Sequence, residues 1–184
     1  MSVRILANDT EAFKEIAPGI HFRRGIDEDA TPTNNDAIAN TGFIVGRESV
    51  AVMDPGGSLL DGQRLRATIR KTTPLPIRYV VLSHVHADHI FGAGAFAEDK
   101  PPFTGHTLLP NALSQRGDFY RTNLDKLLGG PGKAGPVVAP TLLVKDPTKI
   151  DLGGGRILDI TAHGNAHTDC DLTVLDRQTG TLLL

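Results

Sequence analysis

Hydrophobic residues fall into short runs separated by polar and glycine-rich turns, and this pattern predicts a chain built mainly of short strands. The most apolar run, residues 77–83 (Ile-Arg-Tyr-Val-Val-Leu-Ser), is typical of a strand buried on both faces of a sheet. Residues 41–46 and 49–54 predict a pair of strands that turns at residues 47–48. The other predicted strands cover residues 19–24, 104–109, 141–144, 148–152, 155–161, 171–176 and 180–184.

Helical spacing is found in fewer places. Residues 61–72 place Leu65 and Ile69 on one face, four positions apart. A longer helix is predicted from Pro110 to residue 128, because proline suits the first helical position and glycines follow the end. Residues 90–96 predict a short helix. The predicted elements come in the order hairpins, then strand–helix–strand, then more strands. This order predicts a mixed α/β (α+β layered) fold class.

The bulk properties suit one domain, which we take to span residues 1–184 with residues 1–18 as an N-terminal arm or lead-in helix. A net charge of −2 gives no field that would attract a polyanion. No stretch is long and apolar enough to cross a bilayer, and residues 1–10 lack the apolar core of a secretion signal. We therefore expect a small-molecule substrate, and neither nucleic acid nor membrane as a partner. The default location is cytoplasmic, or periplasmic if a leader has been removed.

Residues 84–89 (His-Val-His-Ala-Asp-His) have the highest density of potential metal ligands in the chain, with three of the seven histidines and one carboxylate. Imidazole and carboxylate are ligands that Zn²⁺ prefers. His84 and His86 point to the same side if the backbone is extended. Asp88 and His89 follow where the chain turns into the next helix, so they can face the same pocket. This arrangement predicts a metal centre with room for two ions and favours a metal-dependent hydrolase.

A second cluster lies between two predicted strands, at residues 161–172. A loop there can present a third imidazole to the first cluster. We favour His167 over His163, because the Thr-Asp-Cys-Asp run that follows His167 is suited to fix its ring. The single cysteine, Cys170, excludes an internal disulfide. The roles of His163 and Cys170 stay open.

The motif at residues 83–96, together with residues 53–56 (Met-Asp-Pro-Gly) and 165–168 (Asn-Ala-His-Thr), resembles the metallo-β-lactamase superfamily of zinc hydrolases. It is most similar to the branch associated with sulfur oxidation and periplasmic quinoprotein relay systems. The resemblance covers roughly residues 15–184. It implies a four-layer αββα sandwich, of which this chain holds the N-terminal portion including the third-histidine loop.

The same resemblance implies a role for each site residue. His84, His86 and His167 would bind a first metal, and Asp88 and His89 a second. Asp54 would brace the histidine loop from outside, as outer carboxylates orient metal ligands. Asp88 would also be catalytic, because it would hold the nucleophile and move a proton. The cofactor would be one or two Zn²⁺ ions, with iron or manganese as alternatives.

The sequence departs from the family pattern near residue 184. The family supplies a bridging aspartate and a final histidine after the third-histidine motif, and neither follows here. This departure predicts a C-terminally incomplete domain with a weak second metal site. The apolar final segment, residues 181–184, predicts a homodimer or a C-terminal fragment as partner.

The expected mechanism is hydrolysis by a metal-bound hydroxide, since zinc lowers the pKa of bound water to about 7. The substrate would be a thioester, an ester or an amide such as a β-lactam. Three alternatives stay open: an iron redox protein with one or two metals, a nuclease, and an inactive half-domain that needs a partner. Oxygen-reducing diiron members carry glutamate where this chain has His86, which favours hydrolysis. The absence of a basic stripe argues against a nuclease.

Overall fold

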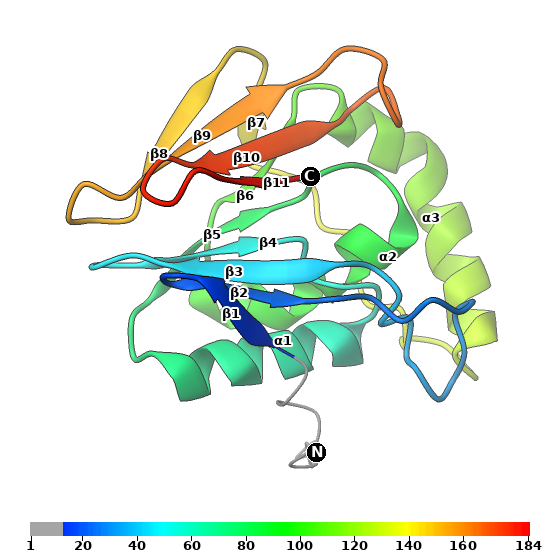
Figure 1. The fold of residues 1–184 in the computed structure, drawn as a ribbon. Coiled ribbons are helices and arrows are strands. Elements are labelled where there is room, and N and C mark those ends of the chain that lie inside the picture. Colours follow the sequence, from blue (N-terminus) through cyan, green and yellow to red (C-terminus); the bar gives the residue numbers. More distant parts are fainter. Residues whose placement is uncertain (1–12) are drawn as a thin grey trace.

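The computed structural model describes residues 13–184 and shows two β-sheets stacked face to face (Figure 1). The larger sheet has seven strands in sequence order: β1 (Lys14–Ala17), β2 (Ile20–Arg23), β3 (Thr41–Val45), β4 (Val50–Met53), β5 (Ile77–Val81), β6 (Phe103–His106) and β7 (Leu142–Val144). Strands β1 to β4 are antiparallel, and β4 to β7 run parallel. The smaller antiparallel sheet has the order β11-β10-β9-β8, with β8 (Thr148–Asp151), β9 (Ile157–Ala162), β10 (Leu172–Asp176) and β11 (Thr181–Leu183).

Helices cover the face of the larger sheet that is turned away from the smaller one. They are α1 (Leu59–Thr72), α2 (Ala87–Ile90), the 3₁₀ helix η2 (Phe91–Asp99) and α3 (Leu109–Leu127). Figure 1 shows α1 beneath the larger sheet and the smaller sheet above it. Ser58 caps α1, because its side chain accepts a hydrogen bond from the backbone N–H of Asp61.

Strand β5 contributes to two separate cores, as its apolar sequence predicts. Val80 packs with Leu65 and Ile69 of α1 in the core between helices and sheet. Val81 packs with Ile160 of the smaller sheet in the core between the two sheets. All of these side chains are at most 1% exposed, and burying one such aliphatic side chain contributes about 1.5–3 kcal/mol. The end of β5, which leads into the histidine motif, is therefore held from both sides.

Several elements differ from the sequence-based expectation. Residues 14–17 form the edge strand β1 rather than part of an arm or helix, because the turn at residues 18–19 folds them back onto β2. The rest of the expected arm, residues 1–12, lies outside the described residues. The helix expected at residues 90–96 begins earlier, at Ala87, and changes to 3₁₀ geometry at Phe91. The strand expected at residues 104–109 ends at His106.

The described residues form three layers in the order helices, large sheet, small sheet. Within residues 13–184, no helix covers the outer face of the smaller sheet. Leu175 and Leu182 pair across β10 and β11 on that face and are 36% and 54% exposed.

Candidate metal centre

Three segments distant in sequence meet at one edge of the sheets. Asp54 directly follows β4, residues 83–89 follow β5, and His167 lies in the loop between β9 and β10. Because β4 and β5 are parallel, their carboxyl ends open onto the same edge, where ligand sites of α/β proteins commonly form. The backbone N–H of Leu172 donates to the carbonyl of Ser83 at 2.8 Å, which joins the two sheets there.

Three imidazoles converge at this edge. Nε2 of His84 lies 3.1 Å from Nδ1 of His86, and Nε2 of His167 lies 3.0 Å from the same Nδ1. One nitrogen from each ring therefore belongs to a set whose members lie within 4.8 Å of one another. Two nitrogens bound to one tetrahedral zinc at about 2.0–2.1 Å lie roughly 3.3 Å apart, so the spacing of this cluster fits a metal of that size.

A hydrogen-bonded chain of Asp54, Ser83 and His84 lies behind the imidazole cluster. Asp54 accepts hydrogen bonds from the backbone N–H and the hydroxyl of Ser83, both at 2.8 Å. The Ser83 hydroxyl lies 2.8 Å from Nδ1 of His84. Since that hydroxyl donates its proton to Asp54, it can accept one from Nδ1, which leaves Nε2 of His84 with a free lone pair for a metal.

The backbone of Asp54 is held in an unusual conformation. Its φ angle is +51°, a left-handed value that non-glycine residues rarely adopt, and the residue is 1% exposed. Such strain persists where surrounding structure over-determines it, often at functional sites. Here Asp54 receives hydrogen bonds from Ser83 and lies 2.7 Å from Nδ1 of His89, so it braces both ends of the histidine motif.

His89 lies between two carboxylates. Its Nδ1 contacts Asp54, and its Nε2 lies 3.4 Å from Oδ2 of Asp88. Burial alone would lower its pKa, but the charges and hydrogen bonds of Asp54 and Asp88 raise the pKa of His89 to about 10. Burial would raise the pKa of Asp88, yet its hydrogen bond to His89 holds that pKa below the usual value. Asp88 and His89 thus lie together beside the three-imidazole cluster.

Burial sets the protonation state of His84 and His86. Burial, followed by the positive field of His89, lowers the pKa of His84 to about 4. The pKa of His86 is also lowered, first by burial and then by His167. Both rings are therefore neutral at physiological pH, which is the form that binds a metal.

The loop that carries His167 is fixed by the residues after it. Asp171 accepts hydrogen bonds from the backbone N–H and the hydroxyl of Thr168, both at 2.7 Å. The backbone N–H of Cys170 donates to the Thr168 hydroxyl at 3.1 Å. Cys170 itself is fully buried and packs in the core beneath the helices. The Thr-Asp-Cys-Asp run thus closes a small turn directly beside the His167 backbone.

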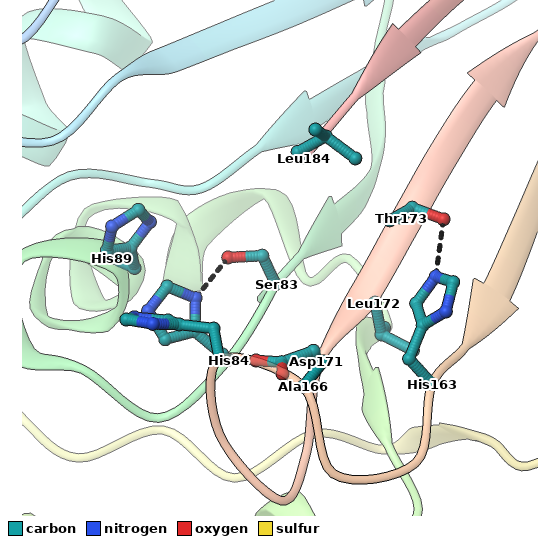
Figure 2. Close-up of a pocket in the computed structure, with 10 residues that line it drawn as sticks. Ser83, His84, His89, His163, Ala166, Asp171, Leu172, Thr173 and Leu184 are labelled. Carbon is teal, nitrogen blue, oxygen red and sulfur yellow. Dashed lines mark hydrogen bonds between the residues drawn. The ribbon is translucent and has the colours of Figure 1, made fainter.

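A cavity of about 550 Å³ opens beside the imidazole cluster. Its lining is mainly apolar apart from the histidines and comprises Ser83, His84, His89, His163, Ala166, His167, Asp171, Leu172, Thr173 and Leu184. Figure 2 shows His163 turned toward Thr173, with Nε2 lying 2.8 Å from the hydroxyl, rather than toward His84. His163 therefore lines the cavity without joining the cluster.

Sequence reasoning missed part of this arrangement. Ser83 was expected only as the end of a strand and the first residue of the family motif, with no role in the centre, because its contact with Asp54 spans 29 positions and has no local signature. Thr168 and Asp171 were foreseen only as a run that fixes the His167 ring. The six residues predicted for the centre lie together at this edge: Asp54, His84, His86, Asp88, His89 and His167.

Comparison with known proteins agrees with the fold and the motif. Residues 34–183 match the model of the Metallo-beta-lactamase superfamily, and the chain belongs to that superfamily. It is 32% identical over 80 residues to the linear primary-alkylsulfatase of Pseudomonas sp. (strain ATCC 19151). The aligned part is 40% of this chain and only 15% of the sulfatase.

Solved structures show the same fold at low sequence identity. The metallo-β-lactamase from Hirschia baltica superposes with a TM-score of 0.66 at 16% identity, over 92% of this chain and 68% of that one. The metallo-β-lactamase from Pontibacter korlensis gives a TM-score of 0.67 at 15% identity, over 90% of this chain and 66% of that one. The chain thus spans about two thirds of these enzymes.

The three-histidine cluster of this superfamily member is suited to hold a divalent metal. Among the described residues, no helix has the length and apolar character needed to cross a membrane.

Proposed function

We propose that this chain is the metal-binding part of a zinc-dependent hydrolase that cleaves a carbonyl-type substrate. The observation that carries the proposal is the convergence of one nitrogen each from His84, His86 and His167 within 4.8 Å. Three imidazoles are the ligand set of a catalytic zinc that keeps one position open. Asp88 and His89 would form a second, weaker position beside it.

When bound at the three imidazoles, a divalent metal supplies Lewis acidity, which lowers the pKa of water to about 7 and polarises the electrophile. Side chains of this chain would orient the water, transfer its proton and position the ligands. Asp88 would orient the attacking water and accept its proton. Asp54 would hold His89 and, through Ser83, keep Nε2 of His84 free of a proton. Leu172 and Leu184 would shield the acyl group from bulk water.

The cavity and the relatives support two candidate substrate classes. An apolar lining beside a metal centre suits a compound whose reactive ester, thioester or amide is attached to an apolar group. The alkylsulfatase relative adds sulfate esters as a second candidate class, because its name describes hydrolysis of a primary alkyl sulfate.

A substrate panel tests this proposal. The protein, loaded with one equivalent of Zn²⁺, is assayed with p-nitrophenyl acetate, an acyl thioester, nitrocefin and p-nitrophenyl sulfate. We expect turnover of at least one carbonyl substrate, which disappears after chelation and returns when zinc is added. The His86→Ala variant should be inactive, and His163→Ala should retain activity. Zinc-loaded protein that turns over none of the carbonyl substrates would overturn the proposal, and turnover of the sulfate ester alone would replace it by the second class.

A further inference from the structure

The wall of the cavity beside the metal centre holds a polar pair that the metal centre does not use. Nε2 of His163 lies 2.8 Å from the hydroxyl of Thr173, and both residues line the same cavity of about 550 Å³ as His84 and His167. Figure 2 shows the pair on the other side of the view from His84, with Leu172 between them. Within residues 13–184, the only side-chain hydrogen bond of either residue is the one that joins them. The pair therefore keeps hydrogen-bonding capacity for a molecule in the cavity.

The backbone holds both members of this pair in place. The N–H of His163 donates to the carbonyl of Asp171 at 3.0 Å, where the loop that carries His167 leaves the sheet. Thr173 lies in β10 and pairs with Thr161 of β9 in antiparallel register. Because the ring and the hydroxyl are positioned before a ligand arrives, little conformational freedom is lost when one binds.

The other polar side chains on this wall already have partners. Both oxygens of Asp171 accept hydrogen bonds from Thr168, and the Ser83 hydroxyl is engaged by Asp54. The remaining histidines of the lining belong to the metal centre. The rest of the wall is apolar, so a polar group of a bound molecule that lies away from the metal finds its partners at His163 and Thr173.

The donors and acceptors of the pair define the group that fits. If Nε2 of His163 donates to the Thr173 hydroxyl, Nδ1 keeps a lone pair and the hydroxyl keeps a proton to donate. If the hydroxyl donates to Nε2 instead, Nδ1 carries the proton and the hydroxyl oxygen keeps a lone pair. In both cases the pair offers a donor and an acceptor. An amide N–H and C=O or a hydroxyl group matches both, whereas a carboxylate matches only the donor and an ammonium group only the acceptor.

We propose that His163 and Thr173 bind an uncharged amide or hydroxyl group of the substrate while the scissile bond lies at the three imidazoles. The inference rests on the proposed hydrolase. It narrows the substrate to molecules in which an apolar stretch, packed against Leu172, separates the scissile bond from that group. His163 and Thr173 thus select the substrate and are not metal ligands. p-Nitrophenyl acetate has no such amide or hydroxyl group, so this contact plays no part in its hydrolysis.

Thiol probes on cobalt-substituted protein test the inference without any turnover, because a thiolate bound to Co²⁺ gives a charge-transfer absorption band. N-Acetylated aminoalkanethiols of increasing chain length are titrated, each beside the plain alkanethiol of the same length. The thiolate takes the open position of the metal, and the amide reaches the wall of the cavity. We expect one chain length at which the amide-bearing thiol binds about tenfold more tightly than its plain counterpart.

Two variants and a matched control assign that preference to the pair. Thr173→Val removes the hydroxyl and keeps the β-branched shape that suits a strand, and His163→Phe keeps an aromatic ring and removes both nitrogens. Each should bring the affinity ratio of the two thiols close to one. Thr161→Val is the control, because Thr161 lies directly opposite Thr173 on the same face but does not line this cavity. It should keep the wild-type ratio.

Cobalt binding separates the possible outcomes. Bound cobalt with no preference for the amide at any chain length would overturn this inference and leave the hydrolase proposal intact. A preference that survives in both Thr173→Val and His163→Phe would overturn it as well. Protein that binds no cobalt at its imidazoles would overturn the metal centre itself, and this inference with it.

Discussion

The Oγ of Ser83 lies 2.8 Å from Nδ1 of its neighbour His84. Because the same hydroxyl donates to Asp54, the contact selects the tautomer of His84 that turns a free lone pair toward His86 and His167. The serine before the motif therefore determines how well the first histidine can bind a metal.

Replacing Ser83 by alanine should weaken zinc binding about 10- to 100-fold, in line with the loss of an outer hydrogen bond to a ligating histidine. Competition with a chromophoric zinc chelator measures the change. Ser114→Ala on exposed helix surface is the control and should bind zinc as the wild type does. An unchanged affinity in Ser83→Ala would show that the tautomer of His84 is set in another way.

Replacing either His84 or His86 by alanine should abolish tight zinc binding, because each of them supplies one of three ligands. Isothermal titration of His84→Ala and His86→Ala with Zn²⁺ provides the measurement. His163→Ala is the matched control, since His163 lines the same cavity but bonds to Thr173. Wild-type zinc affinity in both His84→Ala and His86→Ala would refute the ligand assignment. Loss of zinc binding in His163→Ala would show that the choice of His167 as the third ligand was mistaken.

Asp171→Ala should loosen the loop that presents His167, because two hydrogen bonds to Thr168 are lost. We expect a weaker zinc affinity together with a destabilisation of about 1–3 kcal/mol. Asp169→Ala, in the same loop but with a long 3.9 Å contact to Arg116, should change neither quantity much. Chelator competition and urea unfolding report the two effects. Equal behaviour of the two variants would argue against a positioning role for Asp171.

The stability of metal-free protein should depend on pH through Asp36. Burial, followed by the charges of Asp88 and Asp61, raises the pKa of Asp36 to about 7, so the folded state holds a proton that the unfolded state releases near pH 4. The stabilisation from that proton is present at acidic pH and is lost as the pH rises toward 7. The free energy of unfolding of Asp36→Asn, relative to that of the wild type, should therefore be higher at pH 8 than at pH 5. The difference between the two pH values should be on the order of 3 kcal/mol. Urea unfolding in EDTA at both pH values checks it; an equal gain at the two values would contradict the raised pKa.

Local patterns predicted the elements that have a strong local signal. The apolar run at residues 77–83 and the spacing of Leu65 and Ile69 gave β5 and α1 within about two residues of their observed bounds. Strand β1 was missed because it is an exposed edge strand without alternation of buried residues. Its pairing depends on the turn at residues 18–19 and on β2, which a local pattern does not contain.

The site was predictable where the ligands lie close together in sequence and less so elsewhere. His84, His86, Asp88 and His89 all lie within six consecutive positions, so their density alone indicates a metal. The bond between Ser83 and Asp54, like the cavity that Asp36 and Asp88 share, forms only when segments tens of residues apart are packed together. Asp36 lies in a polar loop, where nothing in the sequence separates a buried carboxylate from an exposed one.

Anomalous scattering at the zinc edge, from crystals grown with zinc, tests the central claim most directly. The account predicts a strong peak bounded by Nε2 of His84, Nδ1 of His86 and Nε2 of His167, and at most a weaker second peak near Asp88 and His89. A folded protein with no peak among these three nitrogens, or with its strongest zinc bound elsewhere, would contradict it.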